Sequence, residues 1–215
     1  MARPRNSAGR NTREAILDAA LELFAERGYF GTSTREIARA VGVRESALYH
    51  HFESKDAIFH ALVDENGPGR LRQLVTIDVD AMLEAMTAKE LLRRMLDVMV
   101  ATFSIPSEQK MFRLIVQEGA RIAAADVVNP AKVVGKVRQG LAATFAKLAQ
   151  KKLIRPIEPM TTAIMLMGPI ALLRFVHLTH KPDFKAFQAE IDRLFEQFWE
   201  SIKPLEAPTR ARRPS

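Results

Sequence analysis

The sequence predicts an all-α protein of about nine helices, with a three-helix N-terminal domain and a larger helical C-terminal domain. Apolar residues recur at helical spacing along most of the 215 residues, and no strand-like alternation persists. Capping residues precede several of these runs, and glycine or proline ends them. The run Asn66-Gly67-Pro68-Gly69 combines helix-stopping with turn-forming residues, which places the domain boundary there. The expected domains are residues 11–66 and 67–203.

The first helix is expected to start at Asn11 and to end at Gly28. Asn11 with Glu14 has the spacing of a capping box, and apolar residues then recur at helical spacing until the glycine. Residues 1–10, MARPRNSAGR, are predicted to form a basic disordered arm, and they lack the apolar segment of a secretory signal.

A helix-turn-helix is expected at residues 33–52. Ser33 with Glu36 repeats the capping pair, and Gly42 supplies a left-handed stop after a short apolar face. The next helix reaches position 52, and Ser54 caps a fourth. Two short helices joined by a tight glycine turn and held by a longer preceding helix make a helix-turn-helix.

The C-terminal domain is expected to contain longer helices. Thr87 with Glu90 caps a run that Pro106-Ser107 breaks. Further helices are expected at 111–122, from Asn129-Pro130 onward, at 158–178 and at 183–202. Residues 204–215 are predicted to be a basic disordered tail.

The composition excludes several kinds of protein. The chain has no cysteine, so it has no disulfides, thiolate nucleophiles or iron–sulfur clusters. The net charge of +7 suits a nucleic-acid partner, but residues 1–66 carry nine Lys or Arg against ten Asp or Glu. The excess lies in residues 108–155, with ten basic against three acidic side chains. Local arrangement, rather than overall charge, must therefore identify a DNA-binding surface.

The stretch VRESALYHHFESK, residues 43–55, carries the side chains that a recognition helix needs. A helix in the major groove needs small residues near its N-terminal end, so that base edges come close, and donors on its flanks for phosphates. Ser46 and Ala47 meet the first need. Tyr49, His51 and Lys55 meet the second, with Lys55 near the free N–H groups that start the next helix.

The run AILDAALELFAERGYFGTSTREIARAVGVRESALYHHFESKDAIFHAL resembles the N-terminal domain of the TetR family of bacterial transcriptional regulators. The shared positions follow in order without gaps: Phe24, Gly28, Thr34, Ile37, Ala38, Gly42, Val43, Leu48, Tyr49, Phe52 and Lys55. The resemblance implies a sequence-specific DNA-binding regulator, most commonly a dimeric repressor that a ligand releases from a palindromic operator. It also implies that the C-terminal domain binds the effector and forms the dimer.

The resemblance further implies which residues contact DNA: Thr34, Arg35, Arg44, Glu45, Ser46, Ala47, Tyr49, His50, His51 and Lys55. It assigns Tyr49, His51 and Lys55 to phosphates. The base contacts it implies are those of Arg35, Glu45, Ser46, Ala47 and His50. Arg44 occupies a position where the family usually has a Ser or Thr cap, which leaves the recognition helix less well capped.

The C-terminal domain offers candidates for an effector cavity. Met and Phe side chains form a deformable lining, and a proline inside a helix opens a kink. The candidates are Met99, Phe103, Phe112, Arg113, Gln117, Arg121, Met165 and Pro169. The basic excess over 108–155 favours an anionic lipophilic or aromatic effector, although a solvated surface also explains it.

The last two helices are expected to pair across a two-fold axis as a four-helix bundle. The candidate interface residues are Ile164, Leu172, Phe175, Leu194, Phe195, Phe198 and Trp199. A purely intramolecular core explains the same apolar stripes, so that alternative stays open.

Two other classes of protein remain as alternatives. A helical scaffold or partner-binding protein has similar amphipathic helices without specific DNA binding. A helical enzyme fits less well, because no Walker loop or HExxH motif is present. His177 and His180 lack an obvious carboxylate partner, so neither a metal nor another cofactor is expected. The longest uncharged run, 159–173, is shorter than the about 20 residues that span a bilayer, so a cytoplasmic protein is expected.

Overall fold

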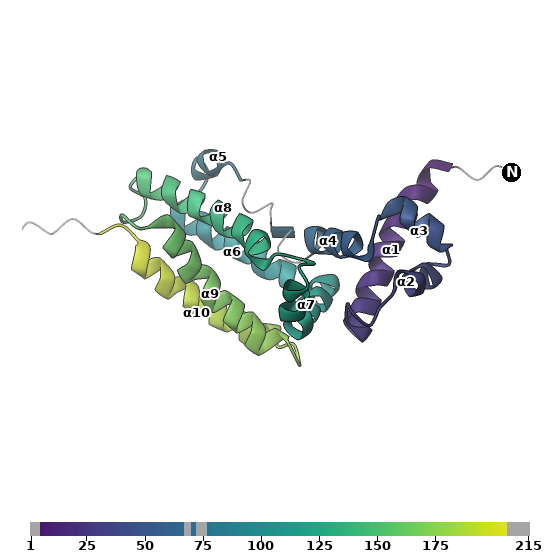
Figure 1. The fold of residues 1–215 in the computed structure, drawn as a ribbon. Coiled ribbons are helices and arrows are strands. Elements are labelled where there is room, and N and C mark those ends of the chain that lie inside the picture. Colours follow the sequence, from purple (N-terminus) through teal and green to yellow (C-terminus); the bar gives the residue numbers. More distant parts are fainter. Residues whose placement is uncertain (1–4, 67–69, 72–76, 206–215) are drawn as a thin grey trace, which may run out of the picture.

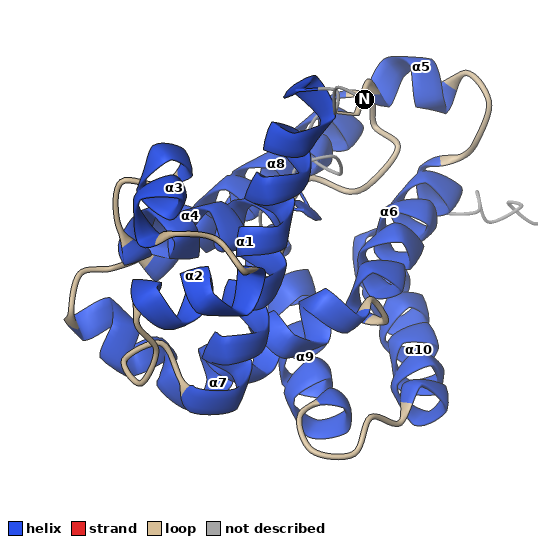
Figure 2. Ribbon diagram, turned by 90° about the vertical axis from the view of Figure 1, so that its right-hand side faces the viewer, coloured by secondary structure: helices blue, strands red, loops and turns tan. Residues whose placement is uncertain are grey.

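The computed structural model describes residues 5–66, 70–71 and 77–205, which form ten α-helices and no strand (Figure 1, Figure 2). The all-α prediction is confirmed. The helices are α1 (Arg5–Arg27), α2 (Thr34–Val41), α3 (Glu45–His51), α4 (Lys55–Glu65), α5 (Val79–Leu83), α6 (Ala88–Phe103), α7 (Pro106–Ala124), α8 (Pro130–Gln150), α9 (Pro159–Leu178) and α10 (Phe184–Ile202).

The capping signals in the sequence set most helix boundaries. Ser33 and Glu36 form the reciprocal capping box that starts α2, and Gly42 ends it in the left-handed region with φ 75°. The Ser54 hydroxyl accepts from the Ala57 N–H at the start of α4. The predicted cap Thr87 starts α6. Asn129 and Asp183, where two further helices were predicted to start, are the N-cap residues of α8 and α10.

Two helix boundaries and one additional helix differ from the prediction. Helix α1 begins at Arg5 and passes through Asn11 without a break, because extending a helix adds one hydrogen bond for each residue fixed. Helix α7 begins at Pro106, whose missing N–H costs nothing at the first helical position. Helix α5, which Asp78 caps, was not predicted. Residues 1–4 of the predicted arm, residues 67–69 of the predicted boundary and residues 206–215 of the predicted tail lie outside the described residues.

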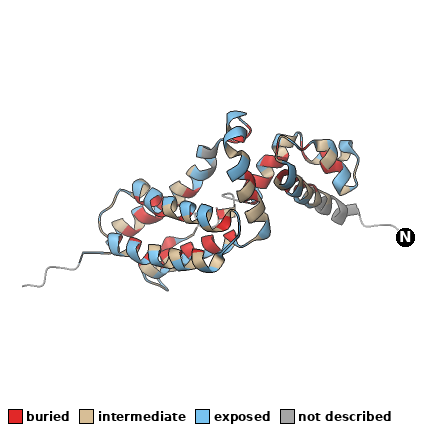
Figure 3. Ribbon diagram, turned by 90° about the horizontal axis from the view of Figure 1, so that it is seen from below, coloured by how far each residue is buried: buried red, intermediate tan, exposed pale blue. Residues whose placement is uncertain are grey.

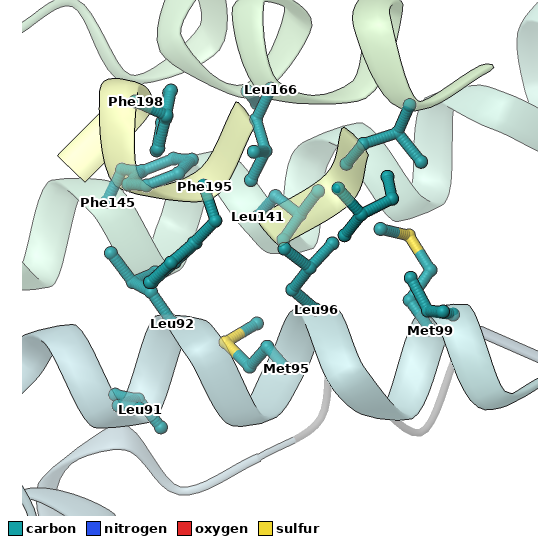
Figure 4. Close-up of a cluster of buried hydrophobic side chains, with 14 of the residues drawn as sticks. Leu91, Leu92, Met95, Leu96, Met99, Leu141, Phe145, Leu166, Phe195 and Phe198 are labelled. Carbon is teal, nitrogen blue, oxygen red and sulfur yellow. The ribbon is translucent and has the colours of Figure 1, made fainter. Parts of the chain in front are cut away.

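Two hydrophobic cores organise the chain. The first lies among α1–α4, with Phe24, Leu48 and Phe59 fully buried. The second lies among α6, α8, α9 and α10, where Phe195 and Phe198 of α10 point inward (Figure 4). Buried residues line the inner faces of these helices and exposed residues their outer faces (Figure 3).

Helix α7 joins the two cores. Its residues Met111, Leu114 and Ile122 are buried in the N-terminal core, and α7 packs against α1. Figure 1 shows α7 beside α4, where the chain passes from the N-terminal helices to the rest. A boundary at 66/67 therefore describes the chain order but not the packing, because α7 completes the N-terminal core.

Candidate nucleic-acid interface and internal cavity

Helix α3 is held by one buried side chain and leaves the rest of its surface free. Leu48 is fully buried, and Phe52, directly after the helix, is also buried. The N–H of Val43 donates to the Ala38 carbonyl at 3.0 Å, which fixes the turn between the two helices of the motif. The short helix is therefore oriented by packing on one face only.

The predicted DNA contacts lie on that free surface. The exposed residues among them are Arg35, Arg44, Glu45, Ser46, Tyr49 and His50, and the partly exposed ones are Thr34, Ala47, His51 and Lys55. Arg44 occupies the cap position of α3 and makes no side-chain capping bond, as expected from the sequence. Its guanidinium is thus not committed to capping the helix.

Thr34 ties the two helices of the motif together. Its hydroxyl donates to the Glu45 carboxylate at 3.1 Å and lies 3.2 Å from the Tyr49 hydroxyl. The Glu45 carboxylate already accepts from this hydroxyl through one oxygen in the unbound protein. A carboxylate has further acceptor sites, so this bond orients Glu45 without preventing it from accepting from a cytosine amine.

Lys55 has an internal role that the resemblance did not imply. Its ammonium donates to the carbonyls of Tyr29 and Thr32, each at 2.9 Å, and lies 4.3 Å from the centroid of the Tyr29 ring. Burial lowers the pKa of this ammonium. Lys55 thus fixes the loop between α1 and α2, and its third N–H is left over for an external acceptor.

A depression in the surface brings together two of the three phosphate-contact candidates, Tyr49 and Lys55, whereas His51 does not line it. The carboxylates of Glu36 and Glu53 also lie in its lining. Its lining includes Ser33 and Thr34 at the start of α2, Ser54 and Lys55 at the start of α4, and Tyr49 of α3. The N-terminal ends of helices present free N–H groups and partial positive charge, which attract phosphate. Sequence reasoning found the separate residues but not this shared site.

Tyr29 is the centre of the loop between α1 and α2. It is 2% exposed, its hydroxyl donates to Asp56, and its backbone N–H donates to the Glu118 carboxylate of α7 at 2.6 Å. Burial, followed by the bond to Asp56, raises the pKa of the phenol. Arg121, one turn further along α7, stacks 4.2 Å from the centroid of the Phe30 ring. This loop therefore connects α4 and α7 with the motif.

A cavity of about 510 Å³, partly open to solvent at the exposed residues Ile115 and Val134, lies between the two cores. Its wall is apolar except at one place, and it is lined by Val63, Leu71, Met99, Phe103, Met111, Phe112, Ile115, Gly119, Ala120, Ile122, Val128, Val134, Val137, Met167, Ile170, Ala171 and Arg174. Three predicted effector residues, Met99, Phe103 and Phe112, lie in this wall. A cavity of this size and character suits a small lipophilic molecule.

Five predicted effector residues do not line the cavity. Gln117 and Met165 are exposed, Arg113 and Pro169 are partly buried elsewhere, and Arg121 stacks on Phe30. Helix periodicity explains the errors, because residues one or two positions from a lining residue point to another face. The charged residue that does line the cavity, Arg174, was missed because it is isolated within an apolar helix.

The apolar face of α9 is open. Ile164, Met165, Leu172, Phe175 and Val176 are 49–62% exposed, and they recur at helical spacing around Gly168. A contiguous exposed apolar face of this kind marks an interaction surface. The predicted interface residues on α9, Ile164, Leu172 and Phe175, all lie on it.

The predicted interface residues on α10 lie elsewhere. Phe195 and Phe198 are 1% and 7% exposed, and the Phe198 ring packs 5.8 Å from that of Phe145 (Figure 4). Leu194 and Trp199 are partly buried against the same core. The hydrophobic period of α10 therefore faces inward, and the prediction was wrong for Phe195 and Phe198.

Helix α9 is long and apolar enough to span a membrane by length and composition. The sequence had suggested otherwise, because only its uncharged part, 159–173, was counted. It is the one such helix among the described residues, and 28% of its most apolar window is buried. Arg174 lies within this helix, and its partner Glu108 is on α7.

Among the residues with described positions, no group of three or more potential metal ligands occurs. His177 does have a carboxylate partner, Glu190, at 3.1 Å.

A short helix-turn-helix with an exposed second helix, joined to a larger helical unit, is the arrangement typical of helix-turn-helix DNA-binding proteins. Residues 16–62 match the family described as bacterial regulatory proteins, tetR family. The match covers the helix-turn-helix and most of the two helices that flank it.

Curated relatives support this assignment for the N-terminal region. The transcriptional repressor KstR2 of Rhodococcus jostii is 42% identical over 85 residues, covering 37% of this chain and 40% of the repressor. The repressor AcnR of Corynebacterium efficiens is 36% identical over 76 residues, covering 35% and 39%. The matched segments thus span less than half the length of these relatives.

Solved structures extend the similarity of fold to nearly the whole chain. A TetR-family regulator from Mesorhizobium loti superposes with a TM-score of 0.72 at 21% identity, covering 94% of this chain and 100% of that chain. The fatty acid degradation regulator FadR from Bacillus halodurans gives 0.67 at 18% identity, covering 92% and 96%. At this level of identity the likeness establishes the fold.

Proposed function

We propose that the protein is a cytoplasmic, homodimeric transcriptional repressor. Each protomer inserts α3 into the major groove at one half of a palindromic operator, and a lipophilic effector in the cavity releases the DNA. The observation that carries the DNA-binding part is the free surface of α3, with Ser46 and Ala47 at its N-terminal end and Tyr49 beside two helix N-termini.

A dimer through α9 supports this function, because two reading heads are needed for a palindromic site. The exposed face around Gly168 is apolar over three turns, and the glycine leaves open space where a second helix approaches. Burial of this face in a four-helix arrangement also explains why so apolar a helix occurs in a DNA-binding protein.

Effector release requires a path from the cavity to the recognition helix. Helix α7 lines the cavity with Gly119 and Ala120 and bonds the α1–α2 loop through the adjacent Glu118. Helix α4 lines it with Val63 and carries Lys55 at its other end. A ligand that fits only one arrangement of these helices shifts the spacing of the reading heads.

The experiment is selection of bound duplexes from a random pool by the purified full-length chain, followed by titration of the selected duplex. We expect a palindromic winner whose affinity falls steeply with rising salt, because several phosphates are contacted. His50→Ala and Tyr49→Phe should weaken binding, while Val98→Ala, on the exposed surface of α6, should not. No enrichment at low salt would leave the scaffold alternative in place.

A further inference from the structure

The cavity opens to water between α7 and α8. Ile115 and Ala120 of α7 and Val134 of α8 line the cavity and are also exposed. Helix α7 packs against α1 and α6, whereas α8 packs against α9, and over their described residues α7 and α8 are not closely packed against each other. A molecule bound in the cavity can therefore reach water between these two helices.

The α9 side of the cavity has one further exposed lining residue, Ala171. It directly precedes Leu172, which belongs to the apolar face that we assign to the dimer. A partner protomer on that face covers this side of the cavity. The opening between α7 and α8 then remains as the route to water.

The interior of the cavity has few partners for a polar group. Among the described lining residues, Arg174 has the one polar side chain, and it is 13% exposed. Its guanidinium lies 4.1 Å from the ring centroids of both Phe103 and Phe112, and its Nη2 atom donates to the Glu108 carbonyl at 3.3 Å. Arg174 is thus already engaged with the protein. A polar head group in the interior would lose its hydration for few new hydrogen bonds, which costs free energy.

We infer that the cavity binds amphiphiles with the apolar tail inside and the polar head group in water at the α7–α8 opening, beside Val134. This inference rests on the proposed effector role of the cavity. The tail gains binding free energy in proportion to the apolar area that it removes from water. The head group keeps its hydration at the opening, so both neutral and charged head groups are accepted. The anionic effector that the basic excess over 108–155 suggested is one member of this class.

The test places a charge at the opening. Position 134 is 43% exposed, so Val134→Lys and Val134→Glu should both fold. The full-length protein is loaded with the fluorescent probe N-phenyl-1-naphthylamine, and three amphiphiles compete with it. Decanoate and decyltrimethylammonium have tails of similar length and head groups of opposite charge. Decanol is neutral and measures any change in binding of the tail.

The two Val134 variants should change the preference for head-group charge in opposite directions. Relative to decanol, we expect decanoate to bind about threefold more tightly to Val134→Lys and about threefold more weakly to Val134→Glu than to the natural protein, as for neighbouring unit charges in water. Decyltrimethylammonium should change in the opposite sense. Val98→Lys and Val98→Glu make the same changes of net charge on the exposed surface of α6, away from the cavity lining, and should leave the ratios unchanged.

Ratios that are the same in both Val134 variants as in the natural protein would place the head group in the interior and overturn the inference. Equal shifts in the Val98 variants would overturn it as well, because net charge alone would then explain the result. Failure of all three amphiphiles to displace the probe would also contradict it.

Release of the operator by the same amphiphiles separates this inference from the proposed function. If the Val134 variants shift the ratios but no amphiphile releases the operator, the binding orientation stands and the effector role fails. If the amphiphiles release the operator while the ratios stay constant, the effector role stands and the orientation is wrong.

Discussion

The Glu118 carboxylate on α7 accepts a 2.6 Å hydrogen bond from the backbone N–H of Tyr29, just after α1 ends. Glu118 is 19% exposed and directly precedes Gly119, which lines the cavity. A buried N–H and a carboxylate make a strong, charge-assisted bond. This bond joins the cavity wall to the loop that carries the helix-turn-helix.

Replacing Glu118 should therefore weaken this contact between α7 and the α1–α2 loop. We expect Glu118→Ala to lower the free energy of unfolding by about 1–3 kcal/mol, because the Tyr29 N–H loses its acceptor. Glu118→Gln retains an acceptor oxygen and should cost less. Chemical denaturation of the three proteins measures this. Equal stability of all three proteins would show that the bond contributes nothing.

The Gly28→Ala substitution should weaken the same contact between Glu118 and the α1–α2 loop. Gly28 has φ +78°, and a Cβ there would lie 2.5 Å from a Glu118 carboxylate oxygen. We expect the free energy of unfolding to fall by about 1–2 kcal/mol from the left-handed backbone alone, and by more because the Cβ pushes the Glu118 carboxylate away from Tyr29. In a double-mutant cycle with Glu118→Ala, the additional loss caused by displacing the carboxylate should disappear. Simple additivity would contradict this account.

Variants of Lys55 and His50 should distinguish effects on stability from effects on DNA affinity. Lys55→Met removes the ammonium that bonds two loop carbonyls, and we expect a loss of about 1–2 kcal/mol of unfolding free energy together with weaker operator binding. His50→Ala alters an exposed side chain, so it should weaken operator binding and leave stability within about 0.5 kcal/mol. An unchanged melting temperature in Lys55→Met would assign Lys55 to DNA contact alone.

The decrease in the free energy of unfolding at alkaline pH should depend on Tyr29. Its pKa is raised above the ordinary 10.0 by burial and by the bond to Asp56, so above pH 10 the unfolded chain loses this proton first. The contribution of the phenol is thus complete below pH 10 and declines above it, by up to about 1.4 kcal/mol per pH unit. The stability advantage of the natural protein over Tyr29→Phe should shrink accordingly between pH 9.5 and about 11. A constant difference over that range would contradict the assignment.

The open face of α9 should decide the oligomeric state. Leu172 is 62% exposed in the single chain, so Leu172→Glu should not unfold a protomer, but it places a charge in the proposed interface. We expect dissociation to monomers, measured by sedimentation velocity, and loss of palindrome binding. Val98→Glu, a matched change on the exposed surface of α6, should leave a dimer. A dimeric Leu172→Glu variant would move the interface elsewhere.

The sequence by itself determined nine of the ten described helices and the motif. Capping pairs such as Ser33 with Glu36, and the left-handed stop at Gly42, act within one or two turns, so they can be identified without knowledge of the fold. The free residues of α3 followed from the same local pattern.

Only the tertiary structure decided which side of each long helix faces the core and which faces the surface. Phe195 and Leu172 both follow an apolar helical period, yet one is in the core and the other on the surface. The period specifies a face but not its partner. Arg174 with Glu108 and Glu118 with Tyr29 meet across long stretches of chain, so no local pattern indicated either pair. Long-range packing thus set the chemistry of the cavity and its connection to the recognition helix.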